Sequence, residues 1–333
     1  MKVLLVQRRA LGDALYTAFV AEVLKREVGA EVHLLTLSSA IELFSSYRYL
    51  DRVVPYGGLL KTAKVLRTER YNWLLDYEAT FRTYPLALLS GAKRRVAFYR
   101  KKRERLLYPL YTDLVPYDAF GFTFWDRLKL LQPLGVDYRK YLGFRPRWVF
   151  KEGTKPPRGL PEGDYLVLAP KGVVPSKEVK PPLVPRLARE LERRTGLRVV
   201  IAVAPGEKEY LRQLREVVAG KFEVFSRPLY DFAFLIKGAR AVVSIESFPY
   251  HFALAVDVPS VVIVQGYPLF FKKTFGLIEE YRVPLDCVPC GGKSCKRRDY
   301  ACTKEVDPAA VARLTENLLR KTASLSPSGS KNF

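Results

Sequence analysis

The sequence contains little methionine, histidine, asparagine or glutamine. Among its 333 residues there are one Met, two His, and seven Asn and Gln together. Few Asn and Gln beside many Lys, Arg and Glu are typical of thermophilic proteins, so we expect a thermophilic source. No apolar run approaches the roughly 18 residues of a membrane span, and Arg8 and Arg9 follow the start too closely for a signal peptide. We therefore expect a cytoplasmic protein with no segment across a bilayer.

Acidic residues are also scarce, and one well-known motif is missing. Only 34 Asp and Glu stand against 56 Lys and Arg, which leaves a net charge of +22. Such an excess attracts anionic partners, namely nucleic acid, anionic lipid or a phosphorylated substrate. The chain lacks the Gly-x-Gly-x-x-Gly pattern of dinucleotide-binding folds, which argues against an NAD-dependent enzyme.

The first 27 residues predict a strand, a tight loop and a helix. The run Lys2-Val-Leu-Leu-Val6 is typical of a parallel strand that is covered on both faces. Gly12 allows the backbone to turn sharply, and Asp13 opens the helix. Asp13 either caps this helix or points into the crevice beyond the strand's carboxyl end, where open α/β sheets bind ligands.

Strands alternate with helices along the rest of the chain. Strands are predicted at 31–37, 51–54, 72–76, 165–169, 197–203, 222–225, 241–244 and 260–264. Helices are predicted at 38–47, 59–70, 82–89, 183–194, 206–218, 229–237, 249–256 and 308–321. The pattern predicts an α/β fold with two doubly wound, Rossmann-like domains facing a cleft. We place the domains at 1–150 and 165–322, a Pro- and Gly-rich linker at 151–164, and a disordered tail at 323–333.

A basic run lies in the predicted first domain. Residues 93–105 hold eight basic residues and one acid, with Phe98 and Tyr99 among them. The run could grip single-stranded nucleic acid, face an anionic lipid headgroup or form a solvated face. No nucleic-acid-binding motif accompanies it, so we expect a lipid or glycolipid partner rather than nucleic acid.

In the second domain, two loops that follow strands carry charged residues. The loop 171–180 places Lys177 ahead of a helix, where an ammonium group and free N–H groups together suit a phosphate. The loop 204–209 carries Glu207 and Glu209. These carboxylates either accept hydrogen bonds from ribose hydroxyls or form the charged first turn of a helix.

A third such loop leads from an apolar strand into a helix as Ser244-Ile-Glu-Ser-Phe-Pro-Tyr-His251. His251 lies in the first turn beside Ser247, in position to contact a phosphate, although a lone histidine is often only packed. The second histidine, His33, lies in a predicted strand and is expected to be structural.

Five segments together resemble glycosyltransferase family 9, the lipopolysaccharide heptosyltransferases. They are Val3–Ala14, Tyr49–Val54, Gly91–Val96, Ser176–Lys180 and Glu246–His251. The last two resemble that family's Lys-x-Trp-Pro and Asp-Thr/Ser-Gly-Pro-x-His motifs. Phe248 stands where those enzymes carry glycine, and a side chain there can block a tight anion loop.

The resemblance implies a GT-B fold and inverting transfer of heptose from ADP-heptose, with no metal or other cofactor for catalysis. Asp13 is the expected general base, and Glu207 the expected adenosine contact. The expected diphosphate-binding residues are Lys177, Glu246, Ser247 and His251. The expected acceptor-binding residues are Gly12, Arg82, Arg94 and Arg95.

All four cysteines lie close together as Cys287, Cys290, Cys295 and Cys302. Thiolates at this spacing suggest a structural zinc site. An iron–sulfur cluster remains open, and so do disulfides if the source is hyperthermophilic.

The leading hypothesis is a heptosyltransferase-like enzyme that builds the lipopolysaccharide core. Its partners are then a nucleotide-sugar donor, an anionic glycolipid acceptor and the inner-membrane surface, where it is peripheral on the cytoplasmic side. The alternatives are a GT-B transferase that uses another nucleotide sugar and a non-catalytic basic protein that binds glycolipid on the same scaffold.

Overall fold

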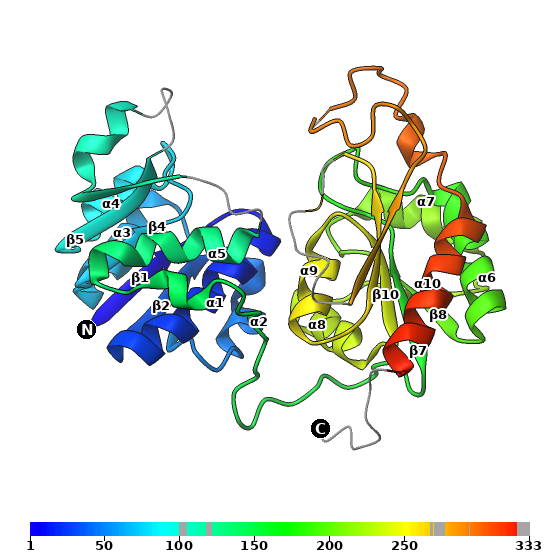
Figure 1. Ribbon diagram of the computed structural model, residues 1–333, viewed down its shortest axis with the longest axis horizontal. Coiled ribbons are helices and arrows are strands. Elements are labelled where there is room, and N and C mark those ends of the chain that lie inside the picture. The colour runs from blue at the N-terminus through cyan, green and yellow to red at the C-terminus, as the bar shows by residue number, and fades with distance from the viewer. Residues whose placement is uncertain (100–104, 118–121, 267–268, 270–276, 293, 325–333) are drawn as a thin grey trace. The chain divides into compact units, whose positions relative to one another are not determined.

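The computed structural model describes residues 1–99, 105–117, 122–266, 269, 277–292 and 294–324. The chain divides into two compact parts, Met1–Lys155 (unit 1) and Pro156–Phe333 (unit 2). Each is built on one parallel six-stranded sheet with helices packed on it (Figure 1). The predicted fold class, two doubly wound α/β domains, is therefore confirmed. Of the predicted tail, residues 325–333 lie outside the described residues.

Unit 1 has the sheet order β3-β2-β1-β4-β5-β6. In that order its strands are Arg52–Pro55, Glu31–Thr36, Lys2–Val6, Trp73–Asp76, Arg94–Tyr99 and Asp113–Pro116. Its helices α1 to α5 are Leu11–Val28, Ile41–Ser45, Leu59–Glu69, Tyr84–Leu89 and Thr123–Leu128. Short 3₁₀ segments lie at Ser38–Ala40, Arg105–Leu110, Lys129–Leu134 and Tyr138–Tyr141. Residues 14–24 of α1 are all buried because this helix packs against both the sheet and α5.

The described part of the basic run is mainly a strand whose basic residues are exposed or half-buried and whose central apolar residues are buried. This strand is β5, which lies between β4 and β6 and begins with charged residues but continues with Val-Ala-Phe. Phe98 is only 1% exposed and packs edge-on against Tyr77 and Tyr117, so it belongs to the core. Residues 100–104, the remainder of the run, lie outside the described residues.

Unit 2 repeats the architecture with the order β12-β11-β10-β7-β8-β9. In that order its strands are Ile278–Arg282, Ser260–Val264, Ala241–Ile245, Tyr165–Ala169, Arg198–Ala202 and Glu223–Phe225. Its helices α6 to α10 are Val184–Thr195, Lys208–Val218, Leu229–Gly238, Phe248–Ala255 and Pro308–Ala323. Two 3₁₀ segments lie at Pro181–Leu183 and Ala301–Thr303. The sequence pattern missed β12 because this edge strand carries polar residues at most of its positions.

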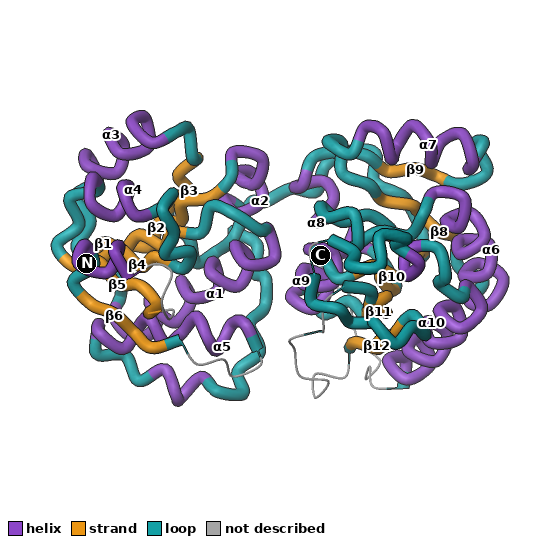
Figure 2. The backbone as a smooth tube through the Cα atoms, turned by 90° about the horizontal axis from the view of Figure 1, so that it is seen from above, coloured by secondary structure: helices purple, strands orange, loops and turns teal. Residues whose placement is uncertain are grey.

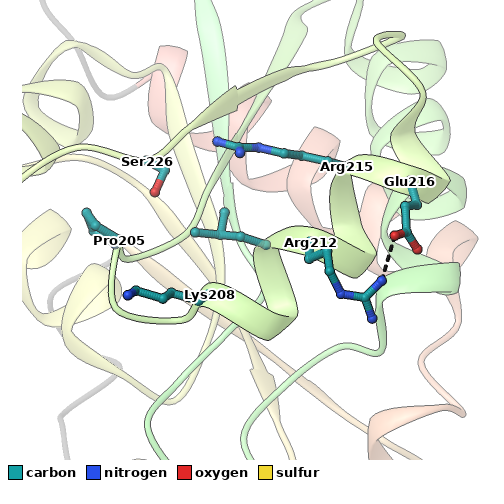
Figure 3. A pocket seen from close by; sticks show the side chains of 7 residues that line it. Pro205, Lys208, Arg212, Arg215, Glu216 and Ser226 are labelled. Atoms are coloured by element: carbon teal, nitrogen blue, oxygen red, sulfur yellow. Dashed lines mark hydrogen bonds and ion pairs between the residues drawn. The ribbon is translucent and has the colours of Figure 1, made fainter.

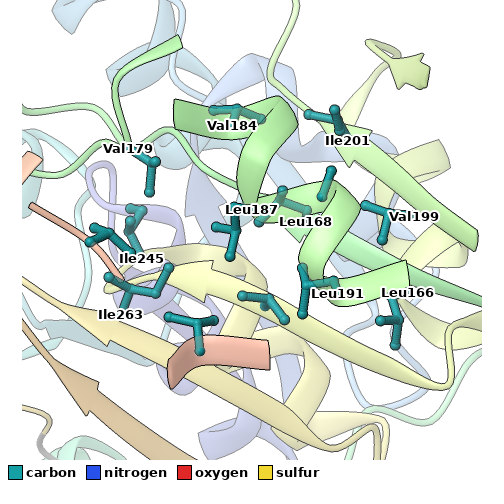
Figure 4. Close-up of a cluster of buried hydrophobic side chains, with 14 of the residues drawn as sticks. Leu166, Leu168, Val179, Val184, Leu187, Leu191, Val199, Ile201, Ile245 and Ile263 are labelled. Carbon is teal, nitrogen blue, oxygen red and sulfur yellow. The ribbon is translucent and has the colours of Figure 1, made fainter. Parts of the chain in front are cut away.

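Apolar strands and helix faces meet in a separate core in each unit. In unit 2, Leu166, Leu168, Ile201, Ile245 and Ile263 point from the sheet toward α6 (Figure 4). The continuous apolar strand runs arise because parallel strands are covered on both faces, as Figure 2 shows for each sheet. None of the helices described here is long and apolar enough to cross a membrane.

Candidate functional site

In each sheet the strand order reverses at one point, called here the switch point, where the connections after two neighbouring strands lead to opposite sides of the sheet. In unit 1 it lies between β1 and β4, and in unit 2 between β7 and β10. Open α/β sheets bind ligands beyond the carboxyl ends of the strands at such a point. The loops there are residues 7–10 and 77–83 in unit 1, and 170–180 and 246–247 in unit 2.

Both of these loops in unit 1 contain a strained alanine. Ala10 has φ +56° and Ala79 has φ +46°, a left-handed conformation that residues with a Cβ adopt rarely. Such strain gathers where the surrounding structure must hold a particular backbone shape, often at functional sites. The backbone conformation therefore points to the same edge of the sheet as the topology.

Asp13 is not the cap of α1. The N-cap is Ala10, which has no side-chain hydrogen bond to the helix, and Asp13 follows within the first turn. Its Oδ1 accepts a hydrogen bond from Arg127 Nη2 at 2.6 Å. The guanidinium is 7% exposed and lies 5.4 Å from the centre of the Tyr77 ring, whereas Asp13 is 47% exposed. Arg127 thus orients a carboxylate that remains accessible.

A second set of charges lies at the same switch point, and the sequence reasoning missed it. Arg8 and Glu78 are both buried, with Arg8 Nη2 3.7 Å from Glu78 Oε2. Burial raises the pKa of Glu78, the nearby charge of Asp76 adds to this, and the positive charge of Arg8 opposes it. The signal available in the sequence was Asp76-Tyr-Glu78, two carboxylates placed directly after an apolar strand.

Asp76 holds the loop after β4 in place. Its Oδ1 accepts hydrogen bonds from the backbone N–H groups of Glu78 and Ala79 at 3.0 and 2.9 Å. The hydroxyl of Tyr111 donates to its Oδ2 at 2.6 Å. Burial nevertheless raises the pKa of this fully buried carboxyl group.

The structure separates the four predicted acceptor residues. Gly12 lies beside Asp13 in the first turn of α1, and Arg82 is exposed in the loop after β4. Arg94 and Arg95 begin β5, so they lie at the amino ends of the strands, at the edge of the sheet opposite to Asp13. Arg94 pairs there with Asp113, while the Arg95 guanidinium donates to backbone carbonyls.

In unit 2 the two loops of the switch point are packed tightly together. A Cβ on Gly172 would lie 2.7 Å from Ile245 Cδ1 and 3.2 Å from Lys177, so any other residue in the loop after β7 would have to displace these neighbours. The Lys177 Nζ then donates a hydrogen bond to the carbonyl oxygen of Glu246 at 3.0 Å. Lys177 and the loop 246–247 are therefore brought together as expected from their places after neighbouring strands.

Glu246 itself joins two strands. Its Oε1 accepts hydrogen bonds from the backbone N–H groups of Gln265 and Gly266 at 2.7 and 2.9 Å, just beyond the end of β11. The side chain is only 4% exposed. Its carboxylate therefore fixes the position of the loop and presents little surface to a ligand.

Ser247 and His251 lie at the start of α9. Ser247 is the N-cap, and its buried hydroxyl has no hydrogen-bond partner within the described part of the chain. Burial, with the positive charge of Lys177 beside it, lowers the pKa of His251 to about 3. The imidazole is therefore neutral at physiological pH. It lies against Tyr250, with ring centres 3.7 Å apart.

Phe248 occupies an ordinary helical position rather than a tight anion loop. It is the first residue of α9, and its φ is not positive. The ring is 8% exposed and stacks on Phe252 one turn later, with ring centres 5.6 Å apart. The side chain therefore packs along its own helix, and the backbone here does not require glycine.

Glu207 faces a cavity of about 420 Å³ at the ends of β7 and β8. Lys171 forms ion pairs with two carboxylates that line this cavity, with its Nζ 2.8 Å from Glu178 Oε2 and 3.7 Å from Glu207 Oε2. Burial would raise the pKa of Glu178, but the ion pairs with Lys171 and Lys180 hold it below its usual value. A cavity lined by three lysines and three glutamates suits a polar ligand that both donates and accepts hydrogen bonds.

A second cavity, of about 550 Å³, lies along α7 (Figure 3). Lys208 lines both cavities, and Ser226, which follows β9, lines the second. Arg212 is held there by an ion pair with Glu216 at 2.6 Å. This surface is consequently basic but partly neutralised.

The four cysteines lie between β12 and α10 of unit 2, in the segment named here the cysteine loop, and are free thiols. Burial, together with the negative charges of Cys295, Cys287 and Cys290, raises the pKa of Cys302 to about 11. The thiols are thus within electrostatic reach of one another. Among the residues described, however, no three His, Cys, Asp or Glu side chains converge as metal ligands would.

No protein-family model matches the chain, and no curated protein matches its sequence. Solved structures do share its fold. The E. coli ADP-heptose lipopolysaccharide heptosyltransferase II has a TM-score of 0.74 at 17% identity, over 97% of this chain and all of that one. A glycosyltransferase family 9 protein from Veillonella parvula gives 0.75 at 17%, covering 96% and 97%. The E. coli heptosyltransferase WaaC, solved with ADP, gives 0.69 at 16%, covering 97% and 100%. The chain therefore has the GT-B fold of the heptosyltransferases, as the sequence motifs predicted.

Proposed function

We propose that the protein is an inverting glycosyltransferase that transfers heptose from ADP-heptose to an anionic lipopolysaccharide inner-core acceptor. The observation that carries the proposal is the position of Asp13. It is an accessible carboxylate, fixed by Arg127 at the switch point of unit 1, in a fold that heptosyltransferases share over their whole length.

In the proposed reaction Asp13 takes the proton from an acceptor hydroxyl as its oxygen attacks the anomeric carbon of the heptose. The bond from that carbon to the ADP oxygen breaks, and ADP leaves with the electron pair. A carboxylate is a suitable base for a sugar hydroxyl, and cationic groups stabilise the charge that develops on the leaving diphosphate.

Unit 2 is the proposed donor unit. Lys177 supplies the positive charge toward the diphosphate, and the Ser247 hydroxyl supplies a hydrogen bond, since it has no partner in the described structure. The neutral His251 can donate or accept a hydrogen bond but adds no charge. Glu207, at the cavity beside Lys171, is the proposed contact for the adenosine ribose.

The partners follow from charge. A net charge of +22 favours an anionic glycolipid and an anionic membrane surface, so we place the enzyme on the cytoplasmic side of the inner membrane as a peripheral protein. Arg82, exposed beside the switch point of unit 1, is the proposed contact for the acceptor from that loop.

We further propose that the cysteine loop is structural rather than catalytic. Its thiols would have to move together to hold zinc, because they do not converge in this structure. Metal analysis of the purified protein, with thiol titration before and after chelation, distinguishes zinc, iron and disulfides. Four reactive thiols and no bound metal would contradict a metal site.

Thermal unfolding with ADP, ADP-heptose, UDP and no ligand tests the donor assignment. A ligand that binds only the folded state adds about 2.7 kcal/mol at a hundredfold excess over its dissociation constant. We expect stabilisation by ADP and ADP-heptose that Lys177→Ala and His251→Ala lose, and turnover that Asp13→Asn abolishes. Stabilisation by UDP alone would retain a GT-B transferase and change the donor. No stabilisation by any nucleotide would refute the enzyme proposal.

A further inference from the structure

The switch point of unit 1 holds a buried arginine, Arg8, whose guanidinium has two N–H groups that are not used in hydrogen bonds within the described residues. Arg8 is 7% exposed, and its Nε and Nη2 are buried without hydrogen-bond partners among the described residues. The guanidinium lies 4.4 Å from the centre of the Tyr56 ring, and its Nη2 lies 3.7 Å from Glu78 Oε2. Burying a cation costs free energy unless it is paired and hydrogen-bonded, so this arrangement is unfavourable for stability alone.

Glu78 lies beside Arg8 but does not accept a hydrogen bond from its Nη2. The separation of 3.7 Å between Glu78 Oε2 and Arg8 Nη2 exceeds hydrogen-bond length. Glu78 Oε2 also has no hydrogen-bond partner in the described structure, while Oε1 accepts one from the backbone N–H of Arg9 at 2.5 Å. Arginine and carboxylate normally meet in a close, two-pronged contact. Here the backbone bond holds the carboxylate slightly too far away.

The unsatisfied guanidinium lies at the same edge of the sheet as Asp13. Arg8 is in the loop that leads into α1, and Asp13 is in the first turn of that helix. Glu78 is on the neighbouring loop, next to Tyr77. The Arg127 guanidinium packs over the Tyr77 ring and donates a hydrogen bond to Asp13. Arg8 and Arg127 therefore both lie at the carboxyl ends of β1 and β4, near the turn of α1 that carries the proposed base.

We propose that Arg8 binds an anionic group of the acceptor, a carboxylate or a phosphate, next to the hydroxyl that Asp13 deprotonates. Glu78 holds the guanidinium in place until the acceptor's anion takes it over. The flat, two-pronged donor edge of arginine matches both anions. This inference rests on the proposed function for the identity of the acceptor, but anion binding at Arg8 can be measured without turnover.

The test uses acetate and inorganic phosphate as separate probes at constant ionic strength, with chloride as the balancing anion. Unfolding of unit 1 is followed by tryptophan fluorescence, since Trp73, Trp125 and Trp148 all belong to this unit. Comparison of the two probes shows whether a carboxylate or a phosphate is the preferred group.

We expect Arg8→Gln to weaken binding of the preferred anion about tenfold or more, because a charge-assisted hydrogen bond is lost. Glu78→Gln is expected to strengthen binding several-fold, because the competing carboxylate is removed. The matched control is Arg9→Gln, which removes the same charge from the adjacent, exposed arginine and should leave the affinity unchanged.

The double variant Arg8→Gln/Glu78→Gln leaves no unpaired buried charge and serves if Arg8→Gln does not fold. Equal anion affinity in this variant and in wild type would overturn the proposal, and so would a loss of affinity in Glu78→Gln. ADP binding by the same proteins reports on unit 2. If ADP does not bind, the proposed transferase activity is contradicted, but the measured anion binding at Arg8 remains valid.

Discussion

Removing the exposed member of the Asp13–Arg127 pair should destabilise unit 1 more than removing the buried member. Asp13 is 47% exposed and Arg127 7% exposed. Asp13→Ala leaves the buried guanidinium without its anion, and an uncompensated buried charge costs about 3–5 kcal/mol. Arg127→Met leaves a carboxylate that water can hydrate. Its cost is then limited to one charge-assisted hydrogen bond and the contact with Tyr77, about 2 kcal/mol.

The double variant separates this explanation from general damage to the site. When Arg127 is absent, Asp13→Ala leaves no buried charge without a partner. The double variant Asp13→Ala/Arg127→Met should therefore lower the free energy of unfolding by about as much as Arg127→Met alone. Urea unfolding followed by tryptophan fluorescence gives the free energies, because Trp73, Trp125 and Trp148 all report on unit 1.

A matched control is the Arg94–Asp113 pair in the same unit. There the arginine is the exposed member, at 47%, and Asp113 is 16% exposed. Asp113→Ala therefore leaves a guanidinium that water can reach, and it should cost less than Asp13→Ala. The reasoning fails if Arg127→Met proves the more damaging single change, or if the two single costs simply add in the double variant.

Three other changes test the rest of the site. Burial and the charge of Lys177 lower the pKa of His251 to about 3, so below pH 6.5 the unfolded chain binds a proton that the folded chain does not. The stability from the neutral ring is complete above pH 6.5 and is lost as the pH falls toward 3. Between pH 7 and pH 4.5 wild type should lose roughly 2 kcal/mol more than His251→Gln, measured by circular dichroism; equal losses would contradict this. Phe248→Ala should lower the free energy of unfolding by about 3 kcal/mol, because the ring is buried against Phe252; a cost below about 1 kcal/mol would show that the ring is not packed there. Arg94→Gln should leave glycosyl transfer unchanged in a turnover assay, because it lies at the opposite edge of the sheet from Asp13; a large loss of turnover would restore it as an acceptor residue.

Local sequence patterns were sufficient for much of the fold. The apolar runs of β1, β7, β10 and β11 are buried along nearly their whole length. A strand that is covered on both faces can be recognised from such a run of consecutive apolar residues. The same patterns missed β6 and β12 and misread β5, since edge strands and charged strand starts look like surface loops.

The sequence by itself determined that two α/β units follow one another and that Asp13, Lys177 and the loop from Glu246 come after strands. Only the tertiary structure decided what these residues contact. Arg127 lies 114 positions from Asp13, and Glu78 accepts a hydrogen bond from a backbone N–H 69 positions away. Such pairs depend on strand order in the sheet, which brings the ends of β1 and β4 together. For the same reason Arg94 and Arg95, which the sequence predicts to bind the acceptor, lie at the amino end of a parallel strand, at the opposite edge of the sheet from Asp13.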